Sequence, residues 1–135
     1  MLKKTALFFS LFILSISAQA QSPASYAVSF AKVSGNKLIL RSQNGIYTLI
    51  YRDDGNLCLN NGTTPIWNTM INGITSTKCK FQADGNLVIY NDSNAVWSSM
   101  TSGKGGYYIS LQDDGNLCIY TKDNIAIWST MTNGK

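Results

Sequence analysis

One short stretch of the chain places chemically capable side chains at every second position: Gln82, Asp84, Asn86, Val88 and Tyr90. These side chains offer two amides, a carboxylate, a phenol and one small aliphatic group. A rigid turn that carries them can donate and accept several directed hydrogen bonds, and the aliphatic side chain can contact C–H groups. This combination suits a neutral polyhydroxylated ligand, meaning a sugar.

The composition is poorly suited to catalysis and metal binding. The chain contains no histidine, which excludes a Ser-His-Asp triad, a Cys-His pair and an imidazole metal site. It also contains no glutamate, and its seven acidic residues are aspartates that lie mostly beside Gly or Asn, as is common in turns. We therefore expect no catalytic residue, no metal site and no cofactor. A secreted hydrolase is the weakest interpretation.

The polar stretch belongs to an internal repeat, which is the main architectural signal in the sequence. The tetrapeptide DGNL occurs three times at a spacing of thirty residues, and each copy is followed by a tryptophan. The third tryptophan comes one residue late, which places an insertion in the loop at 121–126. The repeats lie near residues 45–74, 75–104 and 105–135, and their tryptophans are Trp67, Trp97 and Trp128.

Apolar and polar residues alternate within each repeat, which predicts half-buried β-strands and not helices. In the second repeat we expect a hairpin with the three-residue loop Asp84-Gly85-Asn86, which pairs Gln82 with Val88 and Phe81 with Ile89. One such unit cannot bury its apolar face alone, so three units around a three-fold axis would share a core that the tryptophans fill. Stacking of a tryptophan on a ligand is the alternative.

The spacing Gln-x-Asp-x-Asn-x-Val-x-Tyr resembles the signature of the bulb-type (monocot mannose-binding) lectins, and the second repeat matches it at all five positions. The resemblance covers roughly Leu38 to Lys135. It implies an all-β fold, the β-prism II, with three four-stranded antiparallel sheets around a pseudo-three-fold axis. It also implies a secreted, non-enzymatic lectin that recognises mannose or mannose-containing glycans.

The resemblance implies a role for each motif side chain. In the family the Asp and Asn bind the axial 2-hydroxyl of mannose, the Gln binds the 3-hydroxyl, the Tyr binds the 4-hydroxyl, and the Val packs on the C3–C4 edge. The carbohydrate-binding residues expected in the second and third repeats are Gln82, Asp84, Asn86, Val88, Tyr90, Gln112, Asp114, Asn116, Cys118 and Tyr120. The first repeat is degenerate, and its corresponding residues are Arg52, Asp54, Asn56, Cys58 and Asn60. We expect no mannose binding by the first repeat, which is available for a subunit contact.

The expected partners are mannose or mannosylated glycans. Family members exchange C-terminal strands between subunits, so the resemblance also allows a homodimer, although the tail at 132–135 is short. The charged residues are scattered and form no basic stripe, so we expect no nucleic-acid binding. Two alternatives stay open: a lectin-like bacteriocin or protein-interaction module that uses the same prism fold, and a structural prism whose sites have decayed.

The first twenty residues have the layout of a cleavable secretory signal. Lys3 and Lys4 precede an apolar run, and Ala18 and Ala20 provide small residues before the expected cleavage point. The apolar run is shorter than the roughly 20 residues that span a bilayer, so we expect no membrane insertion. The sequence predicts a signal peptide at 1–20, a single lectin domain at 21–135, and a secreted protein that is extracellular, or periplasmic in a bacterium.

Three cysteines, Cys58, Cys79 and Cys118, cannot all pair within one chain. The repeat register places Cys79 in the core and the other two on the opposite, ligand-facing side. Many plant relatives bridge their first two repeats, and a Cys58–Cys79 bridge would resemble that pair, whereas the strand alternation argues against it. Three reduced thiols are the alternative.

Overall fold

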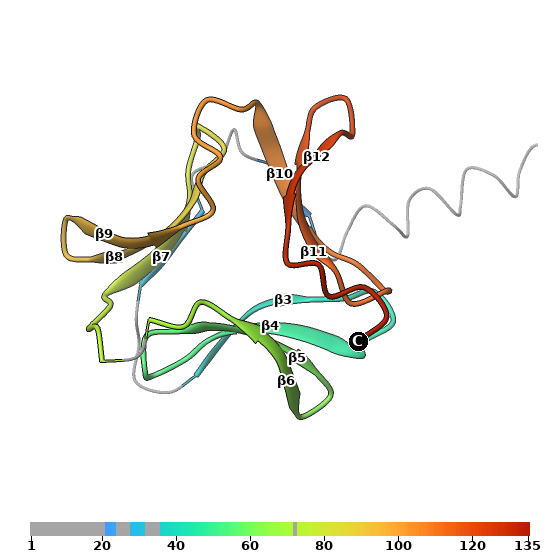
Figure 1. Cartoon of the computed structure of the whole chain (residues 1–135), viewed down its shortest axis with the longest axis horizontal. Coiled ribbons are helices and arrows are strands. Elements are labelled where there is room, and N and C mark those ends of the chain that lie inside the picture. The colour runs from blue at the N-terminus through green and yellow to red at the C-terminus, as the bar shows by residue number, and fades with distance from the viewer. Residues whose placement is uncertain (1–20, 24–27, 32–35, 72) are drawn as a thin grey trace, which may run out of the picture.

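The computed structural model describes residues 21–23, 28–31, 36–71 and 73–135. These residues form three four-stranded antiparallel sheets, which enclose a central axis like the sides of a triangle (Figure 1). The predicted all-β class and the predicted number of sheets are confirmed. The predicted signal peptide lies outside the described residues. Within the described ranges, no helix is long and apolar enough to cross a membrane.

Each repeat builds three consecutive strands of one sheet, so we name the sheets after the repeats. The first sheet contains, in order, β3 (Lys37–Arg41), β4 (Tyr47–Tyr51), β5 (Leu57–Asn61) and β6 (Thr64–Asn68). The second sheet contains β2 (Val28–Ala31), β7 (Lys78–Phe81), β8 (Leu87–Asn91) and β9 (Asn94–Ser98). The third sheet contains β1 (Gln21–Pro23), β10 (Gly106–Leu111), β11 (Leu117–Thr121) and β12 (Ala126–Ser129).

The fourth strand of every sheet comes from the segment before the repeats. Strand β1 pairs with β10, β2 pairs with β7, and β3 pairs with β4. The N-terminal segment therefore passes the third, second and first sheets in turn, and the chain then forms the three repeats in the opposite order. Because each of these strands is hydrogen-bonded to a different repeat, the segment ties the three sheets together.

The hairpin pairing in the second repeat differs from the prediction by two residues. Phe81 is not opposite Ile89, and Gln82 is not opposite Val88; Phe81 pairs with Leu87, two positions closer to the turn. A shift of two keeps every side chain on its predicted face because side chains alternate with a period of two. The predicted division into a core face and an outer face is therefore correct, although the predicted partners are wrong.

The physical reason for the shift is the position of the glycine. The loop consists of residues 83–85, one position before the predicted Asp84-Gly85-Asn86. The Gly85 N–H donates to the Gln82 carbonyl at 2.9 Å, and the Gln82 N–H donates to the Asn86 carbonyl at 2.8 Å. Gly85 has a φ of 82°, so this glycine, and not Asn86, provides the left-handed residue that ends a three-residue hairpin loop.

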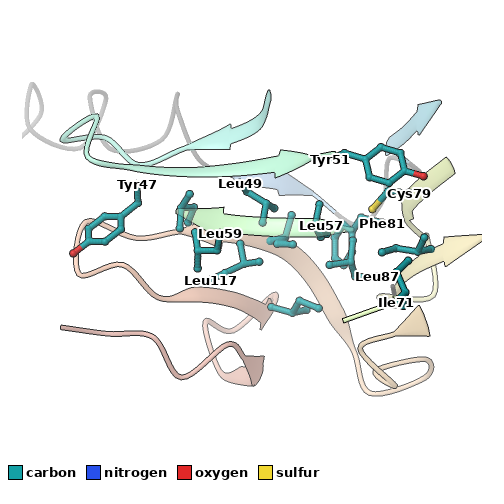
Figure 2. Close-up of a cluster of buried hydrophobic side chains, with 14 residues drawn as sticks. Tyr47, Leu49, Tyr51, Leu57, Leu59, Ile71, Cys79, Phe81, Leu87 and Leu117 are labelled. Carbon is teal, nitrogen blue, oxygen red and sulfur yellow. The ribbon is translucent and has the colours of Figure 1, made fainter. Parts of the chain in front are cut away.

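The inward-facing side chains of the three sheets form one shared core (Figure 2). Leu59, Ile89 and Ile119 occupy corresponding positions in the three repeats, and all three are completely buried. Trp67 and Trp97 pack against this core and meet Trp128 in edge-to-face contacts, with ring centroids 5.9–6.1 Å apart. Such contacts are favourable for aromatic rings. The tryptophans thus serve the core, as predicted, and do not form a ligand platform.

Neighbouring repeats touch at the hairpin glycines. A Cβ on Gly85 would lie 2.6 Å from the carbonyl oxygen of Gly106, at the start of the third repeat's strands. A Cβ on Gly115 would lie 2.6 Å from the ring of Tyr47 in the first repeat, and the Tyr47 hydroxyl donates to the carbonyl of Lys135 at 3.2 Å. The third repeat and the C-terminal tail therefore pack on the first repeat and close the ring.

Candidate functional site

The motif of the second repeat lies on the outer face of the second sheet. Val88 and Tyr90 project from β8 on the face opposite the core residue Ile89. The Gln82 amide nitrogen donates a hydrogen bond to the Tyr90 hydroxyl. This bond brings the two ends of the motif together around Val88, whose side chain is only 2% exposed. The structure therefore gathers the predicted amide, aliphatic group and phenol into one cluster.

The hairpin holds the other two motif residues in fixed orientations. One carboxylate oxygen of Asp84 accepts the Asn86 backbone N–H at 3.0 Å, and the other accepts the Ser102 hydroxyl at 2.8 Å. The Asn86 amide oxygen accepts the Ser99 hydroxyl at 3.0 Å and the Thr101 N–H at 3.1 Å. The Asn86 amide nitrogen has no protein partner among the described residues, so it is left as a donor beside an exposed carboxylate.

The third repeat reproduces this arrangement on the outer face of the third sheet. The Gln112 amide nitrogen donates to the Tyr120 hydroxyl, and Asp114 accepts the Asn116 backbone N–H at 2.8 Å. Cys118 takes the place of Val88 and is 3% exposed. Burial raises the pKa of the Cys118 thiol, so the side chain stays neutral near pH 7 and behaves as a small apolar group.

The first repeat gives a different outer face. Arg52, in the place of the motif glutamine, forms an ion pair with Asp54 at 2.9 Å. The Cys58 thiol donates to the Asn60 side-chain oxygen at 3.4 Å, so a thiol and an amide replace the aliphatic group and the phenol. The motif carboxylate of the first repeat therefore already has a cationic partner.

Comparisons with known proteins place the chain in a family. No protein-family model and no curated protein matches it, but solved structures do. Monomeric monocot mannose-binding lectins from Gastrodia elata match with a TM-score of 0.70 and 34% identity, over 84% of this chain and 98% of theirs. The chain belongs to the monocot mannose-binding lectin family. The mannose-specific agglutinin of snowdrop (Galanthus nivalis), solved with methyl-α-D-mannoside, matches with a TM-score of 0.60 and 31% identity, over 84% of this chain and 97% of its own.

A lectin from Marasmius oreades also matches, with a TM-score of 0.73 and 27% identity, over 87% of this chain and 95% of its own. These matches confirm the β-prism II fold implied by the motif. Because the family consists of lectins, the protein is not an enzyme.

The motif asparagine also has a structural role in this lectin, which the sequence analysis missed. In each repeat its side-chain oxygen accepts the backbone N–H of the residue four positions after the repeat's tryptophan: Asn56 from Ile71, Asn86 from Thr101, and Asn116 from Thr132, at 2.9–3.3 Å. We call this hydrogen bond the asparagine clamp. The clamp connects each hairpin to the chain that leaves the tryptophan strand. A signal was present in the sequence, because Thr69, Ser99 and Thr130, which also donate to the clamp oxygens, recur two residues after each tryptophan.

The three cysteines are free thiols in the structure. Cys58 lies on the outer face and Cys79 in the core, as the strand alternation predicted, and the Cys58–Cys79 bridge is not formed. Cys79 is fully enclosed, and burial raises the pKa of its thiol to about 12.

Proposed function

We propose that the protein binds mannose or mannose-containing glycans through the outer faces of the second and third sheets. The observation that carries this proposal is that Gln82 and Tyr90 converge over Val88, beside the oriented Asp84 and Asn86. The same arrangement recurs in the third repeat. The proposal also draws on the snowdrop relative, which was solved with methyl-α-D-mannoside.

Each group in the second site has a task that its geometry allows. The exposed carboxylate of Asp84 accepts a sugar hydroxyl while the Asn86 amide nitrogen donates to the same hydroxyl, which we assign to the axial 2-hydroxyl by analogy with the family. Gln82 serves the 3-hydroxyl and Tyr90 serves the 4-hydroxyl. The apolar surface around Val88 faces the C–H edge of the sugar. A sugar with an equatorial 2-hydroxyl would leave the carboxylate and the amide without this shared partner.

The first repeat is proposed not to bind mannose. Its carboxylate, Asp54, is held by Arg52, and it lacks the glutamine and the phenol. Each lost hydrogen bond costs on the order of 1 kcal/mol. A single exposed sugar site binds with a dissociation constant near the millimolar range, or about −4 kcal/mol, so the loss of two partners removes most of the affinity.

Useful avidity then comes from two sites on one chain that engage one glycan surface. Strand β12 pairs with β11 of the same chain, so each sheet reaches four strands without a second subunit. A homodimer, if formed, would add valency and is not needed to complete either site. Sedimentation analysis of the mature protein measures the assembly directly.

The protein is further proposed to be secreted after removal of residues 1–20. The basic start, the short apolar run and the Ala-x-Ala end support this proposal. N-terminal sequencing of the exported protein tests it. A mature chain that begins at Met1 would contradict it.

Retention on an immobilised-mannose column tests the binding function. Asp84→Ala and Asp114→Ala should each weaken retention, and the double variant should pass through the column. The matched control is Asp54→Ala, which removes the corresponding carboxylate of the first repeat and should be retained like the parent protein. Undiminished retention of a folded double variant would refute the proposal.

A further inference from the structure

Two lysines share the outer face of the second sheet with its motif. Lys80 lies directly opposite Val88, and Lys78 lies directly opposite Tyr90, so all four side chains project from the same face. The Lys78 ammonium lies 5.3 Å from the centroid of the Tyr90 ring. Both lysine side chains are half-buried, as expected when aliphatic stems pack on a sheet and the charges reach water.

The positive charge of this pair is not neutralised within the described part of the chain. Neither lysine forms an ion pair with any described residue, and the exposed Asp92 in the neighbouring turn pairs with neither of them. The motif carboxylate, Asp84, belongs to the hairpin at the other end of the site. The site is therefore negative at its hairpin end and positive at its tyrosine end.

The other two sheets have no cation at the two positions that correspond to Lys78 and Lys80. The corresponding positions of the third sheet are Tyr108, opposite Tyr120, and Ser110, opposite Cys118. Tyr108 stacks on Tyr120 with a centroid separation of 5.2 Å and an interplanar angle of 21°. In the first sheet the corresponding residues are Thr48 and Ile50, both uncharged. The two motifs thus share Gln, Asp, Asn and Tyr and have chemically different neighbours.

We propose that the site of the second sheet prefers mannose residues that carry an anionic group, a phosphate or a carboxylate, whereas the site of the third sheet prefers neutral mannose. This inference rests on the proposed function. A sugar held by the motif would present its C4–C6 side to the tyrosine end, where the Lys78 and Lys80 ammonium groups can reach a substituent. In the third sheet, the Tyr108–Tyr120 stack stands at the same strand positions and places an apolar ring, not an ammonium group, opposite the motif tyrosine.

Single-site proteins allow the two sites to be measured separately. Asp114→Ala leaves the second site, and Asp84→Ala leaves the third. Each is titrated, with NMR detection, against methyl α-mannoside, mannose 6-phosphate and mannuronic acid. The second site should bind mannose 6-phosphate about five-fold more tightly than the neutral sugar at low salt, as expected for two partly exposed charge pairs. This advantage should shrink in 0.5 M salt, and the third site should show no preference. The mannuronic acid titration distinguishes a carboxylate from a phosphate preference.

Variants of the lysines identify the source of the preference. Lys78→Gln combined with Lys80→Gln should bring the ratio of the two dissociation constants close to one, whereas replacing both lysines with arginine, which keeps the charges, should preserve the ratio. The matched control, Lys122→Gln, removes a lysine from a turn of the third sheet and should also preserve it. Equal ratios at both sites, or a ratio that survives the glutamine variant, would overturn this inference and leave the lectin function intact. Failure of both single-site proteins to bind methyl α-mannoside would overturn the proposed function itself.

Discussion

The asparagine clamp predicts that the motif asparagine stabilises the fold even in the repeat that lacks a complete motif. Asn56 is 3% exposed, and its side-chain oxygen accepts the Ile71 N–H at 2.9 Å and the Thr69 hydroxyl at 3.2 Å. The change Asn56→Ala removes this acceptor and leaves a buried N–H and a buried hydroxyl proton without a partner. An unsatisfied buried donor costs about 1–3 kcal/mol, so the free energy of unfolding should fall by about 2–4 kcal/mol.

Urea denaturation followed by tryptophan fluorescence measures this loss. With a denaturant dependence of about 1.5 kcal/mol per molar for a chain of this size, the unfolding midpoint should fall by about 1–3 M. The matched control is Asn68→Ala, an exposed asparagine in the same repeat whose side chain accepts the Met70 N–H at 2.7 Å. Water can replace that bond, so the control should lose less than about 1 kcal/mol. If Asn56→Ala and Asn68→Ala unfold at the same urea concentration, the clamp carries no stability and the argument is refuted.

Three further predictions concern the backbone and the core. Gly85→Ala should destabilise the protein by more than about 2 kcal/mol, because its Cβ would lie 2.6 Å from the Gly106 carbonyl oxygen. Gly45→Ala, with open space around its Cβ, should cost only about 1 kcal/mol. Equal decreases in the melting temperature of the two variants would contradict the packing argument. Met100→Asn should stabilise by about 0.5 kcal/mol, because Met100 is 77% exposed at a φ of 57°, a conformation that asparagine tolerates better; an unchanged or lower melting temperature would count against it. Burial raises the pKa of the Cys79 thiol to about 12 from its usual value near 9.0, so the thiol of the unfolded chain loses its proton at a lower pH than the thiol of the folded chain. The free energy of unfolding should therefore fall by about 1 kcal/mol between pH 8 and 10. Cys79→Val should make that decrease smaller in urea titrations at the two pH values, leaving the part that comes from Cys118, whose pKa burial also raises.

Much of the fold was predictable because the repeat makes each local signal appear three times. Alternation of apolar residues placed Leu59, Ile89 and Ile119 on one face, and all three are completely buried. The recurrence of tryptophan beside aliphatic residues indicated a shared core, and the three rings meet there. These predictions depend on the alternation of side chains along each strand, which a pairing error of two residues leaves unchanged.

Two features were beyond the reach of the sequence. The pairing of the hairpin was predicted two residues too far from the turn, because Gly and Asn can both adopt a positive φ and only the structure shows that Gly85 does so. The route of the N-terminal segment past all three sheets was not predicted either. Its short strands carry no repeat, and the choice of edge depends on long-range pairing that no local pattern specifies.

The DGN segment of the motif is therefore consistent with two roles, folding of the hairpin and binding of a sugar, which the sequence alone does not separate. Gly provides the turn and Asn provides the clamp in all three repeats. This includes the first repeat, in which the motif carboxylate, Asp54, forms an ion pair with Arg52. Selection for folding alone would keep these two residues. The glutamine and the tyrosine are different, because their mutual hydrogen bond lies on the outer surface and forms in the second and third repeats but not in the first. Under the two proposals, Gln and Tyr distinguish a sugar site from a hairpin that only folds. The residues opposite the Val and Tyr positions, such as Lys80 and Lys78, would then set which sugars the site prefers.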